Sequence, residues 1–155
     1  MKKLLEMLGY GTLFLWVLII DRVTKYWVLT YVDNVYQVTD FLSFDFVLNR
    51  GISWGMFHAE SDGIFWLLSL MILGVFMLLV SFAYRRWHEA NLIIGEVLVI
   101  AGAFSNIIDR MLYRGVVDFI VISWGDYFSF PAFNIADACI VVGVFMMLTS
   151  VYRNP

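Results

Sequence analysis

Long apolar runs separated by short polar segments dominate the chain. The clearest run, Gly63–Tyr84, has 22 residues without a charge, and Leu92–Ile108 has 17 interrupted by one glutamate. Met7–Ile20 and Ala138–Tyr152 are shorter and need a few flanking residues to reach spanning length. Because a helix rises about 1.5 Å per residue and the hydrocarbon core is about 30 Å thick, such runs suit membrane spans. The pattern predicts four transmembrane helices, at approximately 7–28, 63–84, 92–108 and 133–152.

The segments between these runs carry a second pattern. From Leu42 to Asn49 apolar residues alternate with polar ones, and only Val47 interrupts the alternation. A period of two with aromatic residues favours a half-buried strand. The segment Val116–Trp124 is β-branched and aromatic, and it either pairs with this strand or lies along the membrane interface. The aromatic belt of that interface would also suit Trp27, Trp54, Trp66 and Trp124.

The composition indicates that much of the surface of the protein lies in lipid. The 155 residues are 62% hydrophobic and 15% charged, against about 45–50% and 25% in soluble domains. Cys139 is the only cysteine, which excludes a disulfide framework, and a net charge of −3 argues against a nucleic-acid binder. The length favours a single integral-membrane domain, residues 1–155, which is all-α in the membrane with a small β-containing segment outside.

Basic residues predict the orientation. Lys2 and Lys3, Arg85 and Arg86, and Arg153 fall in three segments that an even number of spans places on one side. The positive-inside rule makes that side cytoplasmic. Both termini are then inside, and the segments 31–62 and 109–132 are outside. A cleaved signal peptide is disfavoured because the first apolar run ends without a small-x-small cleavage site.

Several ionisable and amide side chains gather at one predicted membrane depth, at the outer helix ends. They are Asp21, Lys25, Asn106, Asp109, Arg110, Asp118, Asn134 and Asp137. Because a charge in a span costs about 2.5–3.5 kcal/mol, their common depth indicates a functional site. Structural alternatives remain open. Asp21 and Lys25 share a helix face as an intrahelical pair, Asp109 pairs with Arg110, and Asn134 with Asp137 caps a helix. Glu96 has no assigned role.

Elimination leaves carboxylates to carry any hydrolysis. His58 and His88 lack a second metal ligand at useful spacing, and no Ser-x-x-Lys, Gly-x-Ser-x-Gly or Cys/His arrangement is present. We therefore expect no metal and no cofactor. The main alternative function is a small proton- or ion-coupled transporter, since intramembrane carboxylates often relay protons. Such transporters usually have midplane sites and internal repeats, and neither is evident here. A non-catalytic membrane subunit is a third alternative.

Four blocks in order give the chain a resemblance to a known family. They are Asp21-Arg22-Val23-Thr24-Lys25; Asn49-Arg50-Gly51-Ile52-Ser53-Trp54-Gly55; Asn106-Ile107-Ile108-Asp109-Arg110 leading to Val117-Asp118-Phe119; and Phe130-Pro131-Ala132-Phe133-Asn134-Ile135-Ala136-Asp137. In these blocks the sequence resembles the bacterial lipoprotein signal peptidases, also called signal peptidase II. It departs from the family at Ala101 and Ser105, where glycine is usual, and at Ser53, where alanine is common.

The resemblance implies an intramembrane aspartyl protease of the bacterial inner membrane, with its active site at the outer face. It would cleave diacylglyceryl-modified prolipoproteins just before the lipid-bearing cysteine, and the cyclic peptide globomycin would inhibit it. The catalytic pair falls on Asp118 and Asp137. Supporting or substrate-binding positions fall on Asp21, Lys25, Asn49, Gly51, Asn106, Asp109, Arg110 and Asn134. Of these, we expect Arg110 and the asparagines to orient the substrate backbone, because Asn both donates and accepts and Arg donates.

Overall fold

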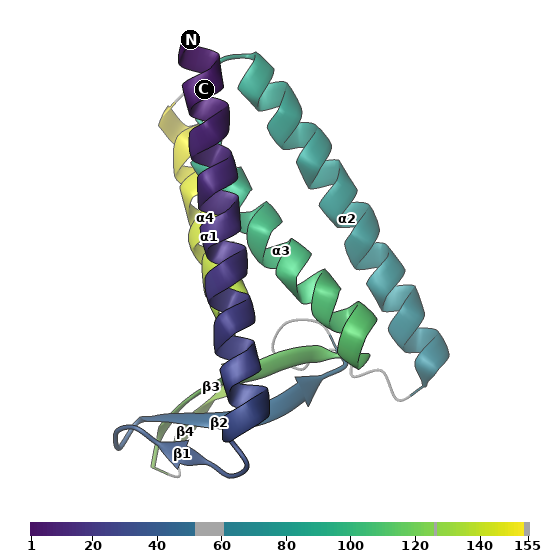
Figure 1. Cartoon of the computed structure of the whole chain (residues 1–155), viewed down its shortest axis with the longest axis vertical. Coiled ribbons are helices and arrows are strands. Elements are labelled where there is room, and N and C mark those ends of the chain that lie inside the picture. Colours follow the sequence, from purple (N-terminus) through teal and green to yellow (C-terminus); the bar gives the residue numbers. More distant parts are fainter. Residues whose placement is uncertain (52–60, 126, 154–155) are drawn as a thin grey trace.

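Four helices and one small sheet make up the computed structural model, which describes residues 1–51, 61–125 and 127–153 (Figure 1). The helices are α1 (Lys2–Tyr31), α2 (Asp62–His88), α3 (Ile94–Tyr113) and α4 (Ile135–Arg153). The strands are β1 (Tyr36–Gln37), β2 (Leu42–Asn49), β3 (Val116–Trp124) and β4 (Phe128–Phe133). The expectations for Ser53, Trp54 and His58 fall outside the described residues.

The sheet lies across one end of the helices, and the start of α1 and the end of α4 lie at the other (Figure 1). Its strands are antiparallel in the order β1-β2-β3-β4. The predicted strand 42–49 is therefore confirmed, and Val116–Trp124 pairs with it. The interrupted alternation has a structural counterpart, because the register with β3 shifts between Phe44 and Val47. A bulge of this kind changes which face later side chains occupy. Phe46, Val47 and Leu48 are all exposed, contrary to the single buried parity that the alternation predicts.

The helix α3 continues beyond the predicted span 92–108 and ends at Tyr113, so Asp109 and Arg110 lie in its last two turns. Between Asp118 and Asp137, β3 and β4 form an antiparallel hairpin. Pro131 lies in β4, which is an edge strand and tolerates the missing N–H donor.

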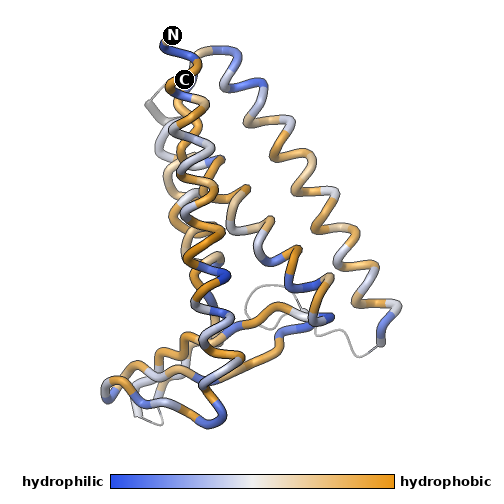
Figure 2. The backbone as a smooth tube through the Cα atoms, viewed as in Figure 1, coloured by the Kyte–Doolittle hydropathy of each residue, from blue (hydrophilic) through white to orange (hydrophobic). Residues whose placement is uncertain are grey.

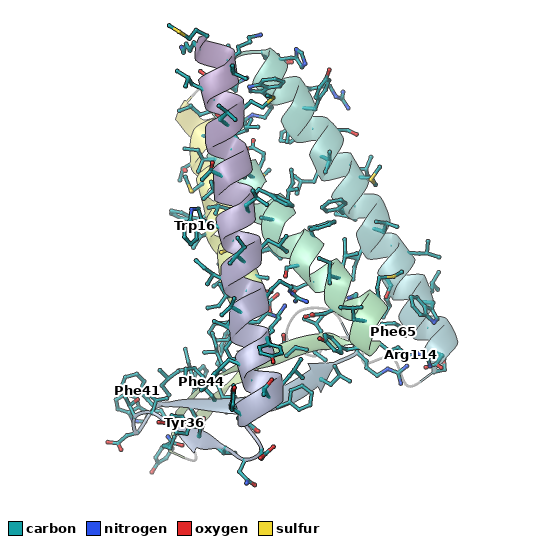
Figure 3. All side chains as sticks on the ribbon, viewed as in Figure 1. Trp16, Tyr36, Phe41, Phe44, Phe65 and Arg114 are labelled. Atoms are coloured by element: carbon teal, nitrogen blue, oxygen red, sulfur yellow. The ribbon has the colours of Figure 1, made fainter. Side chains whose placement is uncertain are left out.

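The outer surface of the helices is apolar, as Figure 2 shows along α2. On that helix Leu70, Met71 and Leu78 are 62–71% exposed, and Trp16 projects away from α1 (Figure 3). Exposed apolar area of this extent indicates contact with lipid. By length and composition α1 and α2 can each cross a membrane, and α4 contains a shorter apolar stretch, Ile135–Ser150. These features fit a membrane protein.

Small residues bring α3 and α4 together. A Cβ added at Gly102 would lie 2.5 Å from the carbonyl oxygen of Ala136, and one at Gly95 would lie 2.8 Å from that of Gly143. Such close backbone approach is the usual basis of helix packing in membranes. It sets the middle of α3 against the first turn of α4, where Asp137 lies. At the opposite end Glu96 is buried and pairs with Arg86 at 3.1 Å.

Candidate active site

Asp118 lies near the start of β3 and is 2% exposed. Both of its carboxyl oxygens accept hydrogen bonds from asparagine amides. Asn49, at the end of β2, donates to Oδ2 at 2.9 Å, and Asn134 donates to Oδ1 at 2.7 Å. Because of the bulge in β2, Val47 is the residue opposite Asp118, and Asn49 follows two residues later. The sheet therefore presents one carboxyl and one amide side by side.

Asp137 lies in the first turn of α4, and Asn134 immediately precedes this helix. The two residues form reciprocal bonds: the Asp137 N–H donates to Asn134 Oδ1 at 2.9 Å, and the Asn134 N–H donates to Asp137 Oδ2 at 3.3 Å. This arrangement resembles a capping box, so the capping role weighed from the sequence is present. Asn106 of α3 donates to the other carboxyl oxygen at 2.8 Å.

The two aspartates face one small cavity of about 130 Å³, which Asn49, Asn106 and Arg110 also line. Asn134 joins them, because its side chain bonds Asp118 while its backbone and side chain bond Asp137. Residues nineteen positions apart in sequence thus come together through the hairpin and the start of α4.

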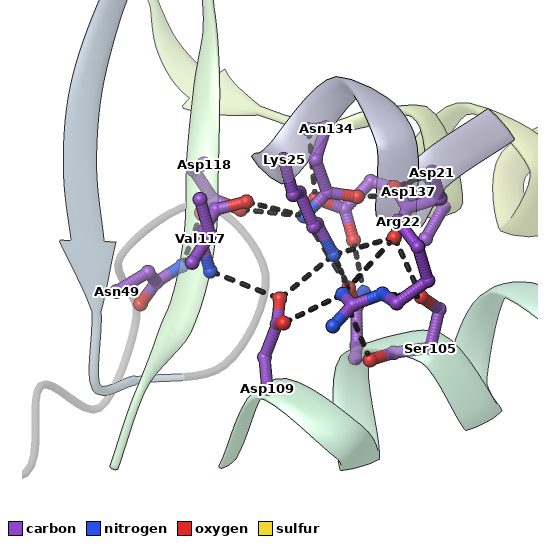
Figure 4. A network of polar contacts seen from close by, with 12 residues as sticks. Asp21, Arg22, Lys25, Asn49, Ser105, Asp109, Val117, Asp118, Asn134 and Asp137 are labelled. Carbon is purple, nitrogen blue, oxygen red and sulfur yellow. Dashed lines mark hydrogen bonds and ion pairs between the residues drawn. The ribbon is translucent and has the colours of Figure 1, made fainter. Parts of the chain in front are cut away.

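A buried ion cluster lies beside this cavity (Figure 4). Lys25 is 1% exposed and contacts Asp21 at 2.7 Å and Asp109 at 2.8 Å. Its ammonium group also donates to Asn106 Oδ1 at 2.8 Å. The Asp21–Lys25 pair expected within α1 is therefore present, but it extends to α3 and, through Asn106, to Asp137.

Asp109 does not pair with Arg110 in the described structure, contrary to the alternative weighed from the sequence. Its carboxylate contacts Lys25 and Arg22 and accepts the Val117 N–H at 3.1 Å. Adjacent residues on a helix point in different directions, so the side chains of residues 109 and 110 do not face each other. The Asp109 side chain instead fixes the start of β3 next to Asp118.

Two residues without an assigned role take part in the cluster. Arg22 contacts Asp109 at 2.6 Å and donates to Ser105 Oγ at 3.0 Å. Ser105 is buried and donates to Asp21 at 2.6 Å. Asp21 also accepts the Ala136 N–H at 2.9 Å, which ties α1 to the start of α4. The only sequence signal was that Arg22 adjoins Asp21 and Ser105 adjoins Asn106, because their partners on other helices lie more than 80 residues away.

Arg110 also lines the cavity. One guanidinium nitrogen donates to the Gly51 carbonyl, and the Arg110 Cζ atom lies 5.5 Å from the centre of the Phe65 ring. The second terminal nitrogen, Nη1, is buried and has no hydrogen-bond partner among the described residues. An unpaired buried donor is costly, so this nitrogen is available for an acceptor that enters the cavity.

The pKa of Asp118 is raised to about 7, chiefly by burial and next by the neighbouring negative charge of Asp137. The bonds from Asn49 and Asn134 and the charge of Lys25 oppose this rise. A carboxyl with such a pKa gains and loses a proton near neutrality, as acid–base catalysis requires. In the described part of the chain, no three His, Cys, Asp or Glu side chains are grouped as metal ligands.

Together, the lipid-facing helices and this carboxyl-lined cavity define a membrane enzyme. Residues 13–153 match the family model described as "Signal peptidase (SPase) II". The chain therefore belongs to the signal peptidase II family, which makes it a protease and gives no support to the transporter alternative.

Individual relatives and solved structures support the same family assignment. A protein named lipoprotein signal peptidase from Clostridium tetani is 33% identical over 140 residues, covering 88% of each chain. One of the same name from Thermodesulfovibrio yellowstonii is 34% identical over 140 residues, covering 89% of this chain and 88% of that one. Two structures described as bacterial membrane enzymes solved by the in meso method have TM-scores of 0.76 and 0.73. They are 27% and 28% identical and cover 94% and 95% of this chain, and 88% and 94% of their own.

Proposed function

We propose that the protein is an intramembrane aspartyl endopeptidase that removes the signal peptide from diacylglyceryl-modified prolipoproteins, just before the lipid-bearing cysteine. One observation carries the proposal: Asp118 and Asp137 line the same small, buried cavity and are joined through Asn134. The names of the relatives support the lipoprotein substrate.

The charges of the site favour a single shared proton. Four carboxyl groups, of Asp21, Asp109, Asp118 and Asp137, lie with three cations, Arg22, Lys25 and Arg110. With all groups ionised the cluster carries one net negative charge, and one proton neutralises it. Lys25 and Arg22 already neutralise Asp21 and Asp109 by contact. The proton therefore belongs to the pair Asp118 and Asp137, which cannot both ionise cheaply at short range.

In the proposed reaction the ionised aspartate takes a proton from a water molecule. The protonated aspartate donates to the oxygen of the scissile carbonyl while the water attacks the carbonyl carbon. Arg110 Nη1 is a buried donor with no partner among the described residues, and it would bind a substrate carbonyl. The asparagines hold the two carboxyl groups in position, since each already donates to one of them. Their direct contact with the substrate backbone stays a prediction.

The experiment that tests this proposal uses purified protein and a synthetic precursor in two forms, with and without the diacylglyceryl group on the cysteine. Mass spectrometry of the products should place the cut immediately before the cysteine in the lipidated form only. A cut elsewhere, or equal cleavage of both forms, would contradict the proposed substrate. On the family resemblance we also propose inhibition by globomycin in the same assay.

Asn49 provides a test of how the amides act. Its bond lowers the pKa of Asp118, so Asn49→Ala should raise that pKa further. The protonated form then persists to higher pH, and the alkaline limb of the kcat/KM profile should shift to higher pH. A lower rate with an unmoved limb would assign Asn49 to substrate binding instead.

We further propose that all four helices cross the bacterial inner membrane, with both termini cytoplasmic and the sheet outside. The 20 residues of α3 extend about 30 Å, enough to span. A reporter fused after Pro155 should report a cytoplasmic location. A reporter inserted at Asp40, between β1 and β2, should report a location on the outer side of the membrane. Activity of both reporters on one side would contradict this topology.

A further inference from the structure

An apolar cavity of about 550 Å³ adjoins the polar one. Its walls come from the β3–β4 hairpin and from α4, and they include Phe128, Phe130, Phe133, Val141 and Val142. Asp137 lines both cavities. One carboxyl of the proposed catalytic pair therefore lies at the junction between a polar space and an aromatic, apolar one.

The polar cavity has a second apolar neighbour. Arg110 lines both the polar cavity and a third space of about 240 Å³, which Trp66, Leu70 and Leu73 of α2 and Met111 of α3 also line. A chain bound across the polar cavity thus meets an apolar space beyond Asp137 and another beyond Arg110. A lipidated precursor has the same layout, with an apolar signal peptide before the scissile bond and acyl chains just after it.

We infer that the cavity between the hairpin and α4 holds the acyl chains of the lipid-bearing cysteine. This inference rests on the proposed function and adds a binding subsite to it. The cavity beyond Asp137 is the larger of the two apolar spaces. Its rim is open to the bilayer, since Val141 and Val142 are 62% and 52% exposed. An acyl chain can therefore enter sideways from lipid without crossing the buried ion cluster.

The cavity acts by positioning rather than by hydrophobic attraction. An acyl chain that leaves the bilayer for an apolar pocket exchanges one apolar surrounding for another, so little hydrophobic free energy is gained. Chains that fit the cavity would instead fix the attached cysteine, and with it the preceding peptide bond, next to Asp137. A displacement of about 1 Å from a reactive geometry can lower a rate about 100-fold.

The test compares two lipidated precursors that differ only in acyl length, with dipalmitoyl and dibutyryl glyceryl groups. Val141→Phe narrows the cavity at a lipid-exposed position where a larger apolar residue is tolerated. Val144→Phe is the matched control, because Val144 lies on the same helix and is 43% exposed but does not line the cavity. Thermal unfolding in detergent checks that both variants are folded.

We expect Val141→Phe to lower the ratio of kcat/KM for the dipalmitoyl over the dibutyryl precursor about tenfold, since misplacement costs rate. Val144→Phe should leave this ratio at the wild-type value. An unchanged ratio in Val141→Phe, or an equal fall in the control, would overturn the subsite while the proposed function stands. Failure of the wild-type protein to cleave either precursor would overturn the proposed function itself.

Discussion

Replacing either aspartate of the cavity by asparagine should abolish cleavage in a protein that still folds. Asp118→Asn and Asp137→Asn keep the side-chain volume but remove the shared proton and the base. Acid–base catalysis contributes about 100- to 10,000-fold per group, so we expect a loss of at least this size in kcat/KM. The measurement is cleavage of the lipidated precursor, with thermal unfolding as the check on folding.

Asp40→Asn is the matched control, because Asp40 is exposed in the turn between β1 and β2. It should cleave at the wild-type rate. Near-normal turnover by either variant of the cavity would mean that the assigned pair is wrong. Asp109 would not replace it readily, because its carboxylate is held by Lys25 and Arg22.

The largest loss of stability should come from Lys25→Met. The Lys25 ammonium is the buried partner of both Asp21 and Asp109, and its removal leaves two buried carboxylates with Arg22 as their remaining cation. Removing one partner of a buried ion pair typically costs about 3–5 kcal/mol. We expect a strongly lowered Tm in detergent.

Lys2→Met removes the same charge from the same helix at an exposed position, where the ammonium pairs only with Glu6 at 3.9 Å. Exposed pairs of this kind contribute little, so the Tm should stay at the wild-type value. If Lys25→Met unfolds no earlier than this control, the cluster does not hold the helices together, and α1 must be fixed by apolar packing alone.

The sequence predicted the elements whose pattern is local. The four helices follow from long apolar runs and the strand 42–49 from a period of two, and the interruption at Val47 corresponds to the bulge in β2. The strand β4 was missed because its six residues contain Pro131 and do not alternate regularly. Its pairing with β3 at the sheet edge makes it a strand, and this pairing cannot be predicted from the residues of β4 alone.

The site was predicted in its members but not in its contacts. The common membrane depth and the family motifs named every aspartate and asparagine that the cavity brings together. The partner of Asp109 was not predictable from its neighbours, because Lys25 lies 84 positions away on another helix. Arg22 and Ser105 were missed for the same reason, since their contacts depend on how α1 and α3 pack.

The pH dependence of kcat/KM for the lipidated precursor tests the shared proton most directly. Asp118 has a pKa of about 7, raised by burial and by Asp137. The protonated member of the pair is therefore lost as pH rises through neutrality. The account predicts that kcat/KM is highest at or below this range and falls as pH rises above about 7. A kcat/KM that instead climbs from pH 7 to 9 would mean that loss of this proton does not slow the reaction, and would contradict an aspartate pair acting through one proton.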